Sequence, residues 1–350
     1  MSGNRGNLPP NQSGLRMEMH LGSMKWNTPI KINPLPDLIN HRDQLLSIGS
    51  CFAEQMSLFF QKRKIRVLSN PSGIVYNPLS IAHLLENLLE ERTVSREDLF
   101  FRDGLYHHYQ FHGSYSGTDA DTIVKKMNTS LESAFTQLRS SRFLILTLGT
   151  SWVYREKKKE EVVANCHKVP NKQFDKEWVS PAVLYKSLLK AFKALQQLKP
   201  DIKIIITVSP VRHLRDGAVE NSRSKAALLL TAAYLQDSLP DIVFYFPSYE
   251  LMMDELRDYR FYGQDLVHPS VVATDYIMRR FAEAAFDSET RNLLNRTEDL
   301  VRAVEHRPFN PDTEEHQRFR KKQLVLVEEL MREYPALDFG EELEYFGGKY

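Results

Sequence analysis

The sequence predicts an α/β fold, a three-layer sandwich around a five-stranded, mainly parallel sheet. Short apolar runs alternate with helical patterns over most of the chain. The central runs, Phe143–Leu148 and Ile202–Val208, are apolar without alternation, as expected of strands covered on both faces. Ligands of such domains bind beyond the carboxyl ends of the strands, so we expect functional residues directly after each strand.

The expected strands are short apolar runs bounded by turn residues: Gln44–Ile48, Ile65–Leu68, Phe143–Leu148, Ile202–Val208 and Ile242–Phe246. The segments between them have helical patterns: Ala53–Lys62, Pro78–Glu90, Asp121–Arg139, Pro181–Gln197 and Asn221–Leu239. This alternation of strand and helix is typical of a sheet with helices on both faces.

One segment departs from the alternation. Ser151–Cys166 indicates two short strands around a charged turn at Glu156–Glu160. Antiparallel pairing of the two strands predicts that Asn165 returns beside Ser151. This β-hairpin insertion is expected to overhang the strand ends.

The chain divides into three predicted parts. Residues 1–23 are rich in Gly, Asn, Pro and Ser, and they predict a disordered leader or a misassigned start. Residues 24–290 hold the α/β domain. Residues 291–350 have charged amphipathic patterns at Glu298–Glu305 and Asp312–Glu333. They predict a C-terminal helical extension that packs on the core or on a partner, which offers a route to oligomers.

Composition excludes several classes of protein. The 350 residues are 42% hydrophobic and 26% charged, which excludes collagen-like, coiled-coil and mostly disordered chains. Lys+Arg 46 against Asp+Glu 45 argues against a nucleic-acid partner. Neither a run of roughly 20 apolar residues nor a signal sequence is present, so we expect no membrane partner and a cytoplasmic location.

The first functional candidate is the turn Gly49-Ser50-Cys51, which follows the first strand and leads into a helix. Backbone N–H groups and the dipole of a helix N-terminus stabilise negative charge, so we expect a lowered thiol pKa and a more nucleophilic Cys51. The structural alternative makes Ser50 a helix N-cap and Cys51 a small buried hydrophobic residue.

The second candidate is the pair Asp265 and His268, on a proline-bounded turn before the last helix of the domain. At this spacing a carboxylate can hold the imidazole Nδ1–H and leave Nε2 as a general base. Such a pair is often structural, but its expected place at the sheet edge that carries Cys51 favours catalysis. We therefore expect the side chains of Cys51 and His268 to lie within hydrogen-bonding reach.

Five strings resemble the GSCFA family, which is similar in turn to the SGNH (GDSL-type) hydrolases: Gly49–Ala53, Asn70–Pro78, Gly149–Trp152, Val163–Lys168 and Ser209–His213. In SGNH hydrolases the first strand ends in Gly-Asp-Ser, with the serine as nucleophile, and a late Asp-x-x-His supplies orienter and base. The resemblance thus implies these two roles for Asp265 and His268. Aligning on Gly49 puts Cys51 at the nucleophile position, with Ser50 as the alternative if the turn is shifted by one residue.

Oxyanion donors match the SGNH pattern less well. For its glycine after the second strand, Gly113 is favoured and Gly73 is the alternative, although both also fit ordinary turns. For its Gly-x-Asn after the third strand, the chain has Gly149-Thr150-Ser151, so the amide is missing. Asn165, returned by the hairpin beside Ser151, is a candidate replacement; the alternative is a turn residue.

The remaining polar residues give weaker signals. His213 follows a strand end and is expected to contact substrate or to pack. A tetrahedral zinc site from Cys51, Cys166, His167 and His268 is conceivable, but no C-x-x-C spacing supports it, so we predict no metal and no cofactor.

The predicted function is an ester hydrolase or acyltransferase that acts on an O-acyl group of a carbohydrate or similar metabolite. The alternative is a non-catalytic carbohydrate- or metabolite-binding protein on the same fold. The missing Asp and Asn of the two SGNH motifs favour binding, whereas the intact pair Asp265 and His268 favours catalysis.

Overall fold

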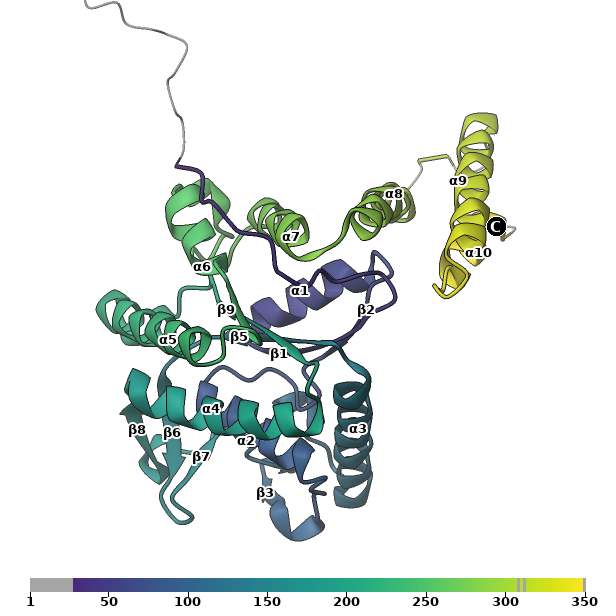
Figure 1. Cartoon of the computed structure of the whole chain (residues 1–350). Helices are drawn as coiled ribbons and strands as arrows, with labels where there is room; N and C mark the ends of the chain where they lie inside the picture. Colours follow the sequence, from purple (N-terminus) through teal and green to yellow (C-terminus); the bar gives the residue numbers. More distant parts are fainter. Residues whose placement is uncertain (1–27, 307–308, 311–312, 349–350) are drawn as a thin grey trace, which may run out of the picture.

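The computed structural model describes residues 28–306, 309–310 and 313–348, and Figure 1 shows the whole chain. The predicted leader, residues 1–23, lies outside the described residues.

A five-stranded sheet with the order β2–β1–β5–β9–β10 forms the centre of the molecule. All four pairs of neighbouring strands are parallel, which confirms the predicted fold class. The strands coincide closely with the five apolar runs: β1 Gln44–Gly49, β2 Arg66–Ser69, β5 Phe143–Leu148, β9 Lys203–Val208 and β10 Val243–Phe246.

Helices cover both faces of this sheet (Figure 1). One face packs against α2 Pro78–Leu89, α3 Ala120–Ser140, α4 Pro181–Leu198 and α5 Ala218–Ser238. The other face packs against α1 Cys51–Gln61, the short α6 Ser248–Glu250 with the π-helical turn Leu251–Glu255, and α7 Val271–Ala285. The five helices predicted from the sequence are α1 to α5.

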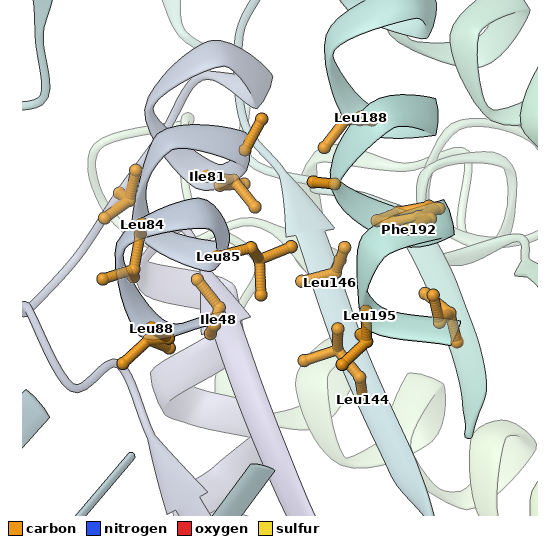
Figure 2. Close-up of a cluster of buried hydrophobic side chains, with 14 of the residues drawn as sticks. Ile48, Ile81, Leu84, Leu85, Leu88, Leu144, Leu146, Leu188, Phe192 and Leu195 are labelled. Atoms are coloured by element: carbon orange, nitrogen blue, oxygen red, sulfur yellow. The ribbon is translucent and has the colours of Figure 1, made fainter. Parts of the chain in front are cut away.

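Successive side chains of a strand point to opposite faces of the sheet, so the strands contribute to two cores. In β1, Leu46 and Ile48 face the core of α2 to α5, whereas Leu45 faces the core of α1 and α7. Figure 2 shows Ile48 and Leu146 between side chains from α2 and α4. Each fully buried aliphatic side chain contributes roughly 1.5–3 kcal/mol, so these layers hold the strand ends in fixed positions.

The predicted hairpin forms, with β6 Trp152–Glu156 and β7 Glu161–Val163 antiparallel. A third strand that the sequence analysis missed, β8 Phe174–Trp178, pairs with the other edge of β6. Strand pairing stops two residues before Asn165, so its return beside Ser151 stays a prediction. Pairing ends at Val163 because the N–H groups of the next two residues, Ala164 and Asn165, donate to the carbonyl of Tyr109.

A second small hairpin precedes α3 and consists of β3 Phe100–Arg102 and β4 Leu105–His107. Stacked rings of Phe100 and Tyr109 connect this hairpin to the apolar cluster under β6 and β7.

The C-terminal part is helical, as predicted, with α8 Ser288–Glu305, α9 Glu314–Glu333 and α10 Gly340–Gly347. These helices share an apolar cluster of their own. A largely buried ion pair between Lys64 and Glu342, with N and O 2.7 Å apart, ties α10 to the loop after α1. In the described part of the chain, no helix is both long and apolar enough to cross a membrane.

Candidate active site

The candidate site lies where the strand order reverses. The crossover from β1 packs on one face of the sheet and the helix that follows β5 packs on the other. In sheets of this type the ligand crevice is expected at such a switch point, here beyond Gly49 and Gly149. The segment between β2 and α2 crosses this crevice. Its Val75 N–H donates to the carbonyl of Gly49 (2.9 Å), and its Tyr76 carbonyl accepts from the N–H groups of Gly149 (2.8 Å) and Thr150 (3.0 Å).

Gly49 is required by a close approach of two strands. Its φ is +152°, and a Cβ there would lie 2.3 Å from the carbonyl oxygen of Thr147. The tight turn lets Ser50 donate its N–H to the same oxygen (3.1 Å) before the chain enters α1. A glycine at this position therefore places the next two side chains at the mouth of the crevice.

Ser50 and Cys51 have different local roles. Ser50 is only 1% exposed and is the N-cap of α1, with its Oγ accepting from the N–H of Phe52 at 3.3 Å. This bond commits the hydroxyl to the helix end. Cys51, the first residue of the helix, is half-buried and free. The arrangement favours Cys51 over Ser50 as nucleophile.

The electrostatics of Cys51 differ from the sequence-based expectation. Burial raises the pKa of the Cys51 thiol above its usual value, and the carboxylate of Glu54 adds to this. The backbone N–H groups of Phe52 and Cys51 and the ammonium of Lys225 oppose the increase. The expected lowering of the pKa is wrong, because the loss of hydration outweighs the helix N-terminus. The resting thiol is therefore neutral and needs a base.

Asp265 and His268 form the predicted pair. Asp265 Oδ2 accepts from His268 Nδ1 at 2.6 Å, while Oδ1 accepts from the N–H groups of Val267 and His268, both at 3.0 Å. The two backbone N–H donors and the imidazole hold the pKa of the Asp265 carboxyl well below its usual range. An ionised Asp265 therefore fixes the tautomer in which Nε2 carries the lone pair.

The structure brings this pair to the edge that carries Cys51. The carbonyl of Val267 accepts from the N–H of Arg212 (3.0 Å), which joins the turn to the loop after β9. Val267 and Cys51 pack against the same apolar core, and α1 and α7 lie side by side in Figure 1. No hydrogen bond joins His268 to Cys51 within the described ranges, so their direct contact stays a prediction.

The two glycine candidates for the oxyanion hole lie close together. Gly73 follows β2 with a φ of +79°, and its N–H donates to the carbonyl of Asn70 (2.7 Å). A Cβ on Gly73 would lie 2.2 Å from the Cβ of His112, the residue before Gly113. Gly113 itself is exposed at the start of a short 3-10 turn. Gly73 is the one that belongs to the segment crossing the crevice.

The remaining predicted site residues, Ser151, His213 and Asn165, have different surroundings. Ser151 is fully buried, and its N–H donates to Ser224 Oγ at 2.8 Å. The ring of His213 lies 6.4 Å from the ring of Tyr76, centroid to centroid, at the rim of the crevice. Asn165 Oδ1 accepts from the N–H of His167 at 2.8 Å, which is the turn role that the sequence left as its alternative. Its part in an oxyanion hole stays a prediction.

Comparison with known families confirms the resemblance to the GSCFA family. The GSCFA family model matches residues 44–281. The chain belongs to the GSCFA family. A second model, the C-terminal domain of GSCFA domain proteins, matches residues 297–349. A comparison with curated proteins found no match.

The GSCFA domain, so placed, runs from β1 into α7 and contains Cys51, Asp265 and His268. The C-terminal domain begins within α8 and includes α9 and α10. All of the predicted site residues therefore lie in the first domain.

Sequence reasoning missed two buried residues at the carboxyl edge of the sheet. Asn70, at the end of β2, is 5% exposed and accepts from the N–H of Gly49 through Oδ1 at 2.8 Å. Its Nδ2 is buried and has no hydrogen-bond partner in the described part of the chain. The signal for Asn70 was its place directly after a strand. The second residue is Lys225 of α5, whose burial gave no sequence signal.

The described residues hold no group of three or more His, Cys, Asp or Glu side chains that could bind a metal ion. The four residues of the conceivable zinc site are therefore not gathered in one place. A cavity of about 240 Å³ lies elsewhere in the GSCFA domain, between α2, the segments on either side of the β3–β4 hairpin and the β6–β7 turn, with His83 and His108 among its lining residues. None of the predicted site residues lines it.

Proposed function

We propose that the chain is an ester hydrolase or acyltransferase that acts on an O-acyl group of a carbohydrate or similar metabolite. Its nucleophile is Cys51, its base is His268, and Asp265 orients the base, as the resemblance to SGNH hydrolases implies. The observation that carries the proposal is the 2.6 Å hydrogen bond between Asp265 Oδ2 and His268 Nδ1, on a turn that two further N–H groups hold in place.

In the first half of the reaction, Cys51 Sγ attacks the carbonyl carbon of the ester while His268 Nε2 accepts the thiol proton. Asp265 remains ionised and stabilises the imidazolium. The tetrahedral intermediate then expels the alcohol, which takes its proton from Nε2–H. A thioester on Cys51 remains.

In the second half, water or a hydroxyl of an acceptor attacks the thioester and gives its proton to Nε2. Collapse releases the acid or the new ester and returns the proton to the thiol. The N–H of Cys51 and the unpartnered Nδ2 of Asn70 are the candidate donors to the oxyanion of both intermediates. One such donor is worth about 10²–10³ in turnover.

A binding protein without chemistry is the second candidate. The raised pKa of the Cys51 thiol favours it, because a neutral thiol is a weak nucleophile until a base removes its proton. In this case the crevice holds the carbohydrate or metabolite but does not transfer an acyl group.

Turnover of short-chain aryl esters and acetylated sugars tests the proposal. Cys51→Ala should lower kcat/KM by about 10³ or more. Cys166→Ala, which removes the other free cysteine, is the matched control and should leave kcat/KM within about twofold of wild type. If wild type turns over no ester and wild type and Cys51→Ala bind the same acetylated sugars equally, the binding function replaces the catalytic one.

We also propose a cytoplasmic location and association of copies through α8 to α10. The free state of both cysteines supports the first proposal, since a reducing compartment keeps thiols unpaired. The largely exposed outer surface of α9 supports the second. Light scattering on the full chain and on a chain that ends before α9 tests the association.

A further inference from the structure

Lys225 is buried in a place that is costly for an ammonium group. Its side chain reaches from α5 to the carboxyl edge of the sheet and the residue is 2% exposed. Nζ donates to the carbonyl oxygens of Gly149 (2.9 Å) and Ser209 (2.8 Å), which directly follow β5 and β9. Within the described ranges no carboxylate forms an ion pair with it. A buried cation without a carboxylate loses hydration that such contacts replace only in part.

The hydrogen bonds of Lys225 fit two charge states. A protonated lysine has three N–H donors, whereas a neutral lysine has two donors and a lone pair. The two carbonyls account for two donors in either state. The third position faces no hydrogen-bond acceptor in the described part of the chain, although the ring of Tyr249 lies 5.8 Å from Nζ. Lys225 can therefore gain or lose a proton without breaking its bonds to the strand ends.

The charge state of Lys225 is linked to Cys51. Burial lowers the pKa of the Lys225 ammonium to about 7, and the negative charge of a Cys51 thiolate raises it. In return, the ammonium lowers the pKa of the Cys51 thiol. The fold places the two groups at neighbouring strand ends, because Lys225 Nζ is bonded to the carbonyl that follows β5 and Cys51 follows β1, the strand paired with β5. Their titrations are therefore coupled.

Other titratable groups face the same space. Glu54 and Tyr76 flank Cys51, and the Cys51 charge in turn raises the pKa of Tyr76, after the larger effect of burial. His213, on the loop after β9, senses the charge of Lys225. Of these neighbours only Lys225 is a buried cation, so it is the group suited to stabilise a thiolate.

We propose that protonated Lys225 is the charge partner of Cys51 and stabilises its thiolate. Lys225 is a positioning residue, because it acts through Cys51. The claim that it contributes to turnover rests on the proposed function. In the first half of the reaction the thiol proton goes to His268, while Lys225 keeps its own proton and offsets the negative charge of Sγ. The reactivity of Cys51 therefore depends on the charge of Lys225.

Alkylation by iodoacetamide tests this without any ester. The rate at the Cys51 peptide is followed by mass spectrometry between about pH 6 and pH 9 in wild type, Lys225→Met and Lys190→Met. Lys190 lies on the exposed surface of α4 and controls for the loss of a lysine. Lys225→Met should raise the apparent pKa of the Cys51 thiol by about one unit, which is about a tenfold lower rate below that pKa. Lys190→Met and the rate at Cys166 should not change. Equal profiles for wild type and Lys225→Met overturn the proposal.

A reciprocal measurement covers the case that Lys225→Met does not fold. In Cys51→Asp a carboxylate replaces the neutral thiol, so the pKa of Lys225, followed through its ¹⁵Nζ resonance, should be higher than in Cys51→Ser, which carries no charge at this position. An equal pKa of Lys225 in the two variants overturns the coupling. Neither measurement uses an ester. A failure of the coupling between Lys225 and Cys51 can therefore be told apart from an absence of ester turnover.

Discussion

The two free cysteines lie in different surroundings at similar depth. Cys166 packs against the apolar cluster of the β6–β8 insertion, with Val163 and Phe174 nearby, and burial raises the pKa of its thiol to about 11. Burial also raises the pKa of Cys51, but there two backbone N–H groups and a buried lysine oppose it. At Cys166 only the charge of Arg215 opposes the effect of burial. Depth alone therefore does not set the pKa of a thiol, because the donors and charges around the sulfur also contribute.

A similar contrast exists between two aspartate turns on the segment before α7. Asp265 holds two backbone N–H groups and an imidazole, whereas Asp258 holds the N–H of Arg260 and no imidazole. Both carboxylates shape a turn. Only Asp265 can orient a base.

Asp265→Asn is the substitution with the largest expected effect in this comparison. The Asn side-chain oxygen can still accept from Val267 and His268 N–H, but its amide cannot replace a carboxylate at Nδ1. Turnover of the best ester should fall by about 10³–10⁴. Asp258→Asn is the matched control and should stay within about twofold. Equal losses of turnover in the two variants would mean that Asp265 only shapes a turn.

Asn70→Asp sharpens the comparison between the two asparagines. Aspartate keeps an acceptor for the Gly49 N–H and removes the Nδ2 donor, so kcat should fall by about 10². Asn165→Ala should change kcat by less than about threefold, because Asn165 is engaged in a turn. Both variants are checked for folding by thermal unfolding. A large loss with Asn165→Ala and none with Asn70→Asp would restore Asn165 as the oxyanion donor.

Lys225→Met has a smaller effect, on the pH dependence of stability. Unfolding exposes Lys225, whose pKa then rises from about 7 toward the usual value of about 10.4. Between these values the unfolded chain binds more protons than the folded one, so this lysine makes the free energy of unfolding rise with pH. Its destabilising effect is full below about pH 7 and is lost toward pH 10.

Urea unfolding of wild type and Lys225→Met at both ends of this pH window measures the effect. Wild type should gain on the order of a few kcal/mol relative to the variant as the pH rises. If the stability of the two proteins changed in parallel with pH, the pKa of Lys225 in the folded protein would not lie near 7.

The sequence predicted the sheet because its strands are covered on both faces. A run such as Phe143–Leu148, which is apolar without alternation, fits a strand that is covered on both faces. Strand β8 was missed because three consecutive charged residues lie between its two aromatic ends, and only pairing with β6 makes them a strand. The end of the hairpin pairing at Val163 could not be predicted, because a distant carbonyl, that of Tyr109, accepts from the N–H groups of Ala164 and Asn165.

Spacing along the sequence was enough to predict those parts of the site whose residues are close in sequence. Asp265 and His268 are three residues apart and one turn brings them together. Lys225 could not be predicted, because its burial depends on how α5 crosses the ends of β5 and β9. The sign of the Cys51 pKa shift likewise depends on tertiary burial, which the local argument from the helix N-terminus leaves out.

Trapping of the acyl intermediate tests the central claim, a thiol nucleophile at Cys51, most directly. Wild type and His268→Ala are incubated with p-nitrophenyl acetate, quenched in acid and digested, and the acetylated residue is identified by mass spectrometry. We predict one acetyl group on Cys51 in wild type, none on Cys166, and much slower acetylation of Cys51 in His268→Ala. Acetylation of Ser50, or equal acetylation of Cys51 and Cys166 with no dependence on His268, would contradict the claim.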